Sequence, residues 1–280
     1  MKIQEFFDKR TYTLTYVVYD PNSKDAVIID PVLDYDKDSK TISFESLSIL
    51  RDFVGQNNLD VRMILETHVH ADHLSSSQYL KELYPGAVLG IGENIRTVQQ
   101  TFKEVLNKED SFPTDGSQFD RLFKDGEKVV AGSLEFEVLS TPGHTPACVS
   151  FYFAGAVFTG DALFMPDSGT GRTDFPAGSA EVLYQSVKKI YDLPDTTKVF
   201  VGHDYQPQGR NLEFVSTVSD QKGNNIHLKA STSEKDFIAM REARDKTLKE
   251  PALLGPSISA NIEGGDQPES KDLEPYSHSS

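Results

Sequence analysis

The sequence VRMILETHVHADHLSSS, residues 61–77, joins an apolar run to a dense group of titratable side chains. Its first five residues have the apolar character of a buried strand. His68 and His70 leave the end of this strand at alternating positions, so both point to the same side of it. Asp72 and His73 follow about one turn later, where the next helix is expected to begin. All four side chains can therefore converge on one small volume.

Imidazole and carboxylate groups in this arrangement favour a metal site. Neutral imidazole nitrogen and carboxylate oxygen are both good ligands for divalent transition metals. The plainer interpretation is a solvated, histidine-rich loop in which Asp72 only caps a helix. We predict a metal site, because the whole pattern His-x-His-x-Asp-His directly follows a strand.

Three further apolar runs lead to a residue of the same kind. His144 stands in a Pro-Gly turn just before the expected strand CVSFYF, Asp161 follows VFTG, and His203 follows KVFVG. Each signal is weak by itself, since a turn after a strand commonly contains such residues. Together with the histidine-rich segment they form a coherent set of candidate metal ligands.

Composition excludes several classes of function. The formal net charge of −15 argues against nucleic acid as the main partner, because phosphate binding requires a basic surface. Cys148 is the single cysteine, so no disulfide can form within the chain, and a reducing, cytoplasmic location is expected. The first twenty residues lack the apolar core of a signal peptide, and no apolar stretch reaches membrane-spanning length. On its apolar strand, Cys148 is expected to be a buried residue rather than a reactive thiol.

Strands and helices alternate along the chain. Two β-branched runs flank PNSK, residues 21–24, which predicts a hairpin. Spaced apolar residues predict helices over 42–56, 95–106 and 179–191, with short strands between them. The expected fold class is therefore a layered α/β (or α+β) architecture.

The chain is expected to have three parts. Residues 1–209 form the main body, and residues 210–255 form an extension that contains one helix and packs on it. Residues 256–280 are polar and acidic, so we expect a mobile tail.

The motifs His-x-His-x-Asp-His, GHT, TGDALF and GHDY resemble those of the metallo-β-lactamase fold superfamily, over roughly residues 2–209. The resemblance implies an αββα sandwich, in which helices flank two mixed β-sheets and the metal lies at one sheet edge. It implies up to seven ligand positions, and every one holds the expected residue type: His68, His70, Asp72, His73, His144, Asp161 and His203.

Superfamily membership leaves the reaction open, because function depends on the site rather than the fold. Two metals would give a hydrolase, whereas one ferrous iron held by two histidines and a carboxylate would give an oxygenase. The segment GTGRTDF, residues 169–175, resembles the signature of the persulfide dioxygenases, also called sulfur dioxygenases. Thr170 departs from the cysteine of many relatives, and the C-terminal helical domain of glyoxalase II is not recognisable.

The persulfide dioxygenase resemblance implies one Fe(II) per chain, with zinc as a substitute, and an oxidation of glutathione persulfide by O2 to sulfite and glutathione. Iron would be bound by His68, His144 and Asp161, while His70, Asp72, His73 and His203 would line a second site that holds water and orients the ligands. Tyr205 is the candidate for a hydrogen bond to bound substrate or oxygen, unless it is only a packed core tyrosine. The candidates for substrate contacts are Arg172, Asp174 and Arg210.

Two other functions remain open at this point. One is a dinuclear thioesterase of glyoxalase II type, and the other is a non-catalytic metal-binding or sulfide-responsive protein. The sequence also leaves open whether a separate sulfurtransferase supplies the substrate and whether the chain forms a homodimer.

Overall fold

One six-stranded sheet comes from the N-terminal half of the chain. In the computed structural model, which describes residues 1–266, its strand order is β1-β2-β3-β6-β8-β9. β1 to β3 are antiparallel, which confirms the predicted hairpin, and the pairs from β3 to β9 are parallel. The strands are β1 (Lys2–Asp8), β2 (Thr13–Tyr19), β3 (Asp25–Ile29), β6 (Asp60–Leu65), β8 (Val88–Gly92) and β9 (Arg121–Phe123).

The second six-stranded sheet has the order β10-β11-β12-β13-β14-β15. Its pairs are antiparallel except β13 and β14, which run parallel. Its strands are β10 (Lys128–Ala131), β11 (Leu134–Ser140), β12 (Val149–Phe153), β13 (Ala156–Phe158), β14 (Lys198–Phe200) and β15 (Val215–Thr217). A small third sheet joins β5 (Thr41–Ser43), β4 (Val32–Asp36) and β7 (Leu74–Ser75).

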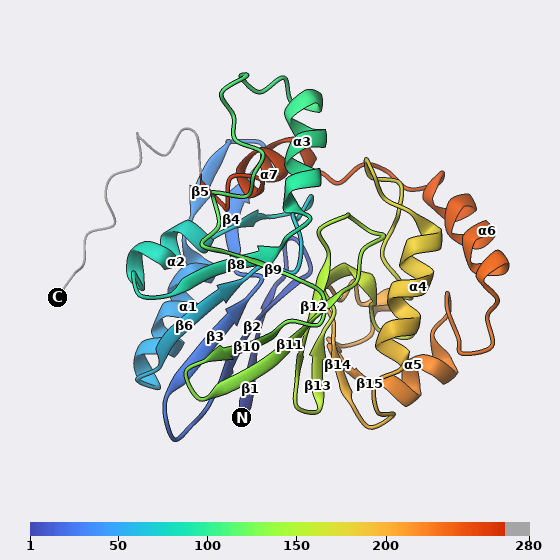
Figure 1. The fold of residues 1–280 in the computed structure, drawn as a ribbon, viewed down its shortest axis with the longest axis horizontal. Coiled ribbons are helices and arrows are strands. Elements are labelled where there is room, and N and C mark those ends of the chain that lie inside the picture. The colour runs from blue at the N-terminus through green and yellow to red at the C-terminus, as the bar shows by residue number, and fades with distance from the viewer. Residues whose placement is uncertain (267–280) are drawn as a thin grey trace.

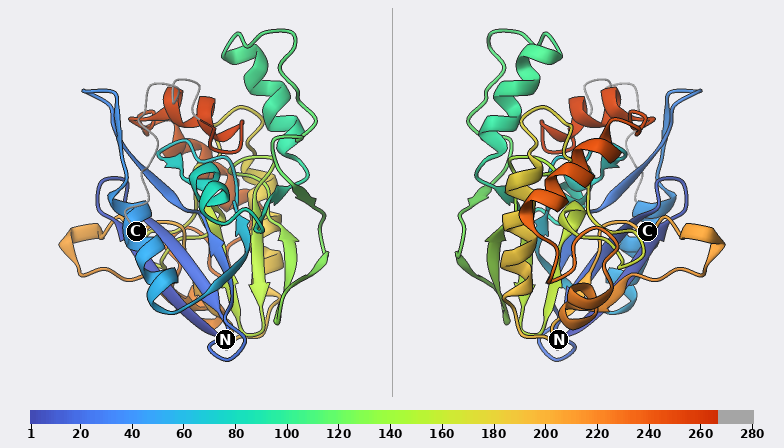
Figure 2. Two further views of the ribbon diagram at one scale, coloured as in Figure 1. Left: turned by 90° about the vertical axis from the view of Figure 1, so that its left-hand side faces the viewer. Right: turned by 90° about the vertical axis from the view of Figure 1, so that its right-hand side faces the viewer.

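The two large sheets pack face to face, with helices on both outer faces (Figures 1 and 2). Val27 and Leu65 of the first sheet share one buried apolar cluster with Phe136 and Phe151 of the second. This apolar contact excludes water from both inner faces and holds the layers together. One outer face carries α1 (Glu45–Gln56), α2 (Ser77–Leu83), α3 (Ile95–Val105) and α7 (Leu254–Asn261); the other carries α4 (Ala180–Tyr191), α5 (Val218–Asn224) and α6 (Glu234–Asp245). The predicted αββα sandwich is confirmed.

The C-terminal segment corrects one prediction. Residues 256–266 belong to a packed region rather than to a mobile tail, since α7 begins at Leu254 and its Ile258 is buried together with Ile262. These two isoleucines stand four residues apart, which places both on one face of the helix. The prediction was wrong because it relied on the acidic average composition of residues 256–280, which does not reveal a short apolar stripe. The remainder of the predicted tail, 267–280, lies outside the described residues, and the boundary at residue 209 stays a prediction.

Parallel strands place their C-terminal ends at a common edge. β3 is parallel to β6 in the first sheet, and β13 is parallel to β14 in the second. The backbone of Leu14, at the start of β2, donates a hydrogen bond to Gly202 just after β14, so the two sheets meet at this edge. None of the helices within residues 1–266 combines the length and the apolar character needed to cross a bilayer.

Candidate metal centre

The seven predicted ligands lie together where these strands end. The connection after β6 carries the histidine-rich segment, and the turn between β11 and β12 carries His144. Asp161 lies in a short 3-10 helix (Gly160–Ala162) directly after β13, and His203 follows β14. Residues more than 130 positions apart in the sequence therefore reach one centre because their strands end at the same edge.

Three of the ligands form a compact group. The ligand atoms of His68, His144 and Asp161 all lie within 4.8 Å of one another. Asp161 Oδ2 is 3.5 Å from His144 Nε2 and 3.9 Å from His68 Nε2, and all three residues are buried. Two imidazoles and one carboxylate at these separations can hold one metal ion.

A second group adjoins the first. His70, Asp72 and His73 also place ligand atoms within 4.8 Å of one another. His203 lies between the two groups, since its Nε2 is 3.3 Å from Asp72 Oδ2 and 3.3 Å from Asp161 Oδ1. The arrangement therefore offers donor atoms for one or for two ions.

Buried polar atoms without a partner show that the site fits a cation. His68 Nε2, His70 Nδ1, His73 Nε2, Asp72 Oδ2 and Asp161 Oδ1 are all inaccessible and lack a hydrogen-bond partner among the described residues. Such atoms are costly to bury unless something pairs with them. A bound metal would satisfy them together, and these are the donor atoms that divalent transition metals prefer.

The other ring nitrogen of each triad histidine is held by the protein. The Nδ1–H of His144 donates to the carbonyl of Arg172 at 2.8 Å, and His68 Nδ1 lies 2.9 Å from the hydroxyl of Thr67. His73 donates from Nδ1 to the carbonyl of Leu74. Such contacts fix the tautomer and turn the free Nε2 toward the metal position.

The pKa values of the histidines divide by environment. Burial, together with the charges of neighbouring imidazoles, holds the pKa of His68 well below its usual value and lowers the pKa of His73 to about 4. Both rings are thus neutral and able to bind metal. Burial opposes charge on His203 too, but Asp72 and Asp161 outweigh it and raise its pKa.

Buried acidic residues behind the ligands were missed from the sequence. Asp30 accepts hydrogen bonds from both the backbone and the hydroxyl of Thr67, at 2.7 and 2.8 Å. Together with Glu66 it also lies within 3.2 Å of His70 Nε2, which raises the pKa of His70 against the effect of burial. Asp30 directly follows β3, so the strand-end pattern that identified the ligands could have found it.

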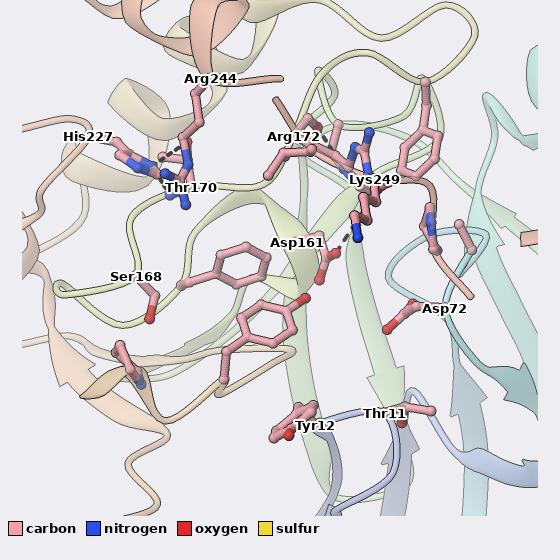
Figure 3. Close-up of a pocket in the computed structure, with 18 of the residues that line it drawn as sticks. Thr11, Tyr12, Asp72, Asp161, Ser168, Thr170, Arg172, His227, Arg244 and Lys249 are labelled. Atoms are coloured by element: carbon pink, nitrogen blue, oxygen red, sulfur yellow. Dashed lines mark hydrogen bonds and ion pairs between the residues drawn. The ribbon is translucent and has the colours of Figure 1, made fainter. Parts of the chain in front are cut away.

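A cavity of about 580 Å³ opens onto the first group of ligands (Figure 3). His144 and Asp161 line it, and Phe164 and Tyr205 form an apolar wall. The ring of Tyr205 stacks on His203 with 5.5 Å between centroids and is 48% exposed, so it is not a packed core tyrosine. Its predicted hydrogen bond to substrate or oxygen stays a prediction.

Five cations line the same cavity, in a chain that is acidic overall: Arg10, Arg172, Arg241, Arg244 and Lys249. Arg241 pairs with Asp245 at 2.6 Å, and Arg10 lies close to acidic groups outside the cavity. Among the described residues, no ion pair or hydrogen bond to another side chain occupies the charged groups of Arg244 and Lys249. Those two cations are therefore the ones available to an anionic ligand.

The segment 169–175 is held tightly beside the metal ligands. Gly171 donates its N–H to the carbonyl of Asp161, and a Cβ there would collide with that carbonyl, so only glycine fits. Arg172 makes a two-pronged ion pair with Asp174 at 2.6 and 2.7 Å and donates to the carbonyl of Lys249. The guanidinium of Arg172 thus lines the cavity but already has partners.

Two other predicted residues lie elsewhere. Arg210 is held between Asp167 and Asp204, with hydrogen bonds of 2.6 to 3.0 Å, and it does not itself line the cavity; its role as a substrate contact stays a prediction. Asp174 serves Arg172 and does not line the cavity either. Cys148 is buried as expected, and burial raises the pKa of its thiol to about 12.

Comparisons with known proteins agree with this geometry. A family model described as the metallo-beta-lactamase superfamily matches residues 9–203. Glyoxylase B2 of Dictyostelium discoideum is 49% identical, over 97% of this chain and 93% of its own length. The mitochondrial persulfide dioxygenase ETHE1 of Bos taurus is 32% identical, over 95% of this chain and 89% of its own.

A solved structure gives the same result at the level of the fold. The crystal structure of ETHE1 from Myxococcus xanthus superposes with a TM-score of 0.75 at 31% sequence identity, covering 95% of this chain and all of the other. The chain therefore belongs to the metallo-beta-lactamase superfamily and, within it, to the family of the persulfide dioxygenases.

Proposed function

We propose that the protein is an Fe(II)-dependent dioxygenase that oxidises glutathione persulfide. In the balanced reaction, glutathione persulfide, O2 and water give glutathione, sulfite and two protons. The terminal sulfur loses electrons to O2, and the sulfur–sulfur bond breaks with glutathione as the leaving group.

The observation that carries the proposal is the group of His68, His144 and Asp161 at the wall of the cavity. Two histidines and one carboxylate are the ligand set of non-haem Fe(II) oxygenases. Bound there, iron would supply the redox chemistry with O2 and a position for the substrate sulfur. Zinc fits the same ligands but would supply no redox chemistry.

The chain's own residues have separate tasks in this proposal. Thr67 and the carbonyl of Arg172 keep His68 and His144 in the ligand orientation. Phe164 and Tyr205 give the cavity an apolar wall that keeps water from the reacting sulfur. No hydrogen bond within residues 1–266 occupies the hydroxyl of Tyr205, which lines the cavity and could donate to a bound substrate.

The free cations of the cavity favour a substrate that carries negative charge. Glutathione persulfide carries two carboxylates, and Arg244 and Lys249 are available to bind them. A chain with a net charge of −15 repels anions at long range, so local cations are needed to bind such a substrate. In this proposal the glutathione carboxylates lie toward the C-terminal end of α6, which carries Arg244, and toward Lys249 in the segment after it.

A dinuclear thioester hydrolase is the second candidate. His70, Asp72 and His73 supply a second group of ligands, and His203 lies between the two groups. A hydroxide that bridges two metals requires two adjacent metal positions, which these groups could provide. The relative named Glyoxylase B2 is also more similar than ETHE1. A third possibility is binding without turnover, in which metal is held but no substrate is consumed.

One experiment separates these functions. Protein loaded with Fe(II) under anaerobic conditions is mixed with glutathione persulfide, and oxygen uptake and sulfite are measured beside hydrolysis of a glutathione thioester. The dioxygenase consumes oxygen and forms sulfite in equal amounts. A hydrolase turns over only the thioester, and a binding protein turns over neither.

A further inference from the structure

A residue near the C-terminal end of the described chain is hydrogen-bonded to the ligand segment. Asn261, the last residue of α7, donates from Nδ2 to the carbonyls of His70 at 2.9 Å and His73 at 2.8 Å. Its Oδ1 accepts from the N–H of Ser75 at 2.9 Å. The side chain is buried, and it uses both donors and its acceptor on this one segment. No other side chain among the described residues makes as many hydrogen bonds to the backbone of this ligand segment.

These bonds act where ligand positions are set. Residues 70–73 supply the second group of ligands, and this stretch is irregular in conformation, so no strand or helix ladder fixes it. The carbonyls of His70 and His73 are the two ends of that stretch. Pinning both ends from one amide group limits how far the ligands between them can move.

Apolar contacts hold Asn261 in place. Ile258 and Ile262 are buried in the cluster that also contains Val98 and Phe102 of α3. Figures 1 and 2 show α7 beside α3, above the edge where the strands end. The C-terminal segment thus covers the ligand segment and is anchored independently of it.

We propose that Asn261 is a positioning residue of the metal centre, which fixes the backbone of residues 70–73 from α7 and so raises the affinity of the second group of ligands, His70, Asp72 and His73, for metal. The proposal depends on metal binding alone and not on the reaction. It also makes the C-terminal helix a working part of the centre rather than an appendage.

The test compares metal binding with stability. Asn261→Ala removes all three hydrogen bonds, and Asn261→Asp keeps the acceptor for Ser75 but loses both donors. Co(II) is titrated into the metal-free full-length protein, and its absorption reports both affinity and ligand geometry. Loss of groups that orient ligands typically weakens metal binding by about 10- to 100-fold. We therefore expect a loss of this size, with an altered spectrum, for Co(II) bound at the second group of ligands in both variants, while Co(II) binding at His68, His144 and Asp161 stays close to that of the parent.

Two controls separate positioning from general stability. Ser257→Ala, on the same helix, removes a buried hydroxyl that has no hydrogen-bond partner among the described residues and should change neither Tm nor Co(II) affinity. Val129→Ala removes apolar packing from the cluster between the two large sheets, which contains no residue of α7, and should lower Tm while changing Co(II) affinity by less than about threefold. Parent-like affinity and spectrum in the Asn261 variants, or an equal loss in Val129→Ala, would overturn the proposal.

A measurement on the unmutated chain covers the case in which the Asn261 variants do not fold. Coupling between two parts is reciprocal, so if α7 supports the metal centre, metal must also stabilise α7. Adding Zn(II) should slow amide hydrogen exchange over residues 254–265. Exchange that is unchanged there, although Zn(II) binds, would contradict the proposal. None of these readouts involves O2 or persulfide, so a failure of the proposed reaction would leave them intact.

Discussion

Removing the two free cations of the cavity should weaken substrate binding without slowing the chemistry. Arg244 and Lys249 line the cavity and have no acidic partner in the described chain. A hydrogen bond to a charged group contributes about 1.5–3 kcal/mol, whereas an exposed ion pair contributes about 0.2–1 kcal/mol. Both side chains are exposed, so we take about 1 kcal/mol each, or roughly fivefold in affinity for one variant and about thirtyfold for the double variant.

The assay is steady-state oxygen uptake against glutathione persulfide concentration, with calorimetric titration of glutathione as a reading that needs no turnover. The contact exists in ground and transition states alike, so KM should rise while kcat changes little. Because the contact is electrostatic and exposed, added salt should narrow the difference between parent and double variant. Lys246→Ala, a nearby exposed cation outside the cavity lining, is the matched control and should behave as the parent. Parent-like KM and glutathione affinity in the double variant would refute this account of substrate binding.

Three other substitutions test separate parts of the structure. Asp161→Ala should abolish iron binding because it removes one of three ligands, whereas His203→Ala should leave iron largely bound with reduced activity; elemental analysis that finds equal loss in both would indicate a dinuclear site. Arg172→Ala should lower Tm and loosen iron rather than raise KM alone, since its side chain holds the segment 169–175, and Arg172→Lys should not restore the parent Tm. The hydrogen bond from Arg62, opposed by burial, lowers the pKa of Asp25 to about 2, so this contact stabilises the fold above about pH 4 and is lost as the pH falls through 2. Asp25→Asn should therefore cost about 1 kcal/mol of unfolding free energy at pH 7 but little at pH 2, and a cost independent of pH in chemical denaturation would rule this out.

The sequence was informative where local pattern and site chemistry coincide. Several strands are followed directly by a residue that can bind metal, and parallel neighbouring strands bring their ends to one edge of the sheet. This repeated pattern identified the candidate ligands from His68 to His203. The same reasoning placed the hairpin and the long helices, because their apolar spacing is regular. It also applies to Asp30, which follows β3 in the same way but was overlooked.

Contacts that depend on tertiary packing could not be derived this way. Asn261 stands between two apolar residues at the end of α7, and its hydrogen bonds to a segment 188 to 191 residues away leave no local pattern in the sequence. The roles of the arginines could not be derived from the sequence either. Arg172 and Arg210 have the same chemistry, but each pairs with different acidic residues in the fold. Arg172 therefore stabilises the cavity wall, whereas Arg210 lies outside the cavity lining. Only the folded arrangement reveals which charges remain free.

The central claim is that iron held by His68, His144 and Asp161 supports persulfide oxidation, and the most direct measurement is oxygen consumption by protein containing one Fe(II) per chain. With glutathione persulfide, we predict uptake of one O2 for each sulfite formed. Protein that contains zinc in place of iron, and the Asp161→Ala variant, should take up no O2 and form no sulfite. Absence of oxygen uptake by the iron-loaded protein, together with thioester hydrolysis that requires two metals per chain, would contradict the claim and establish the hydrolase instead.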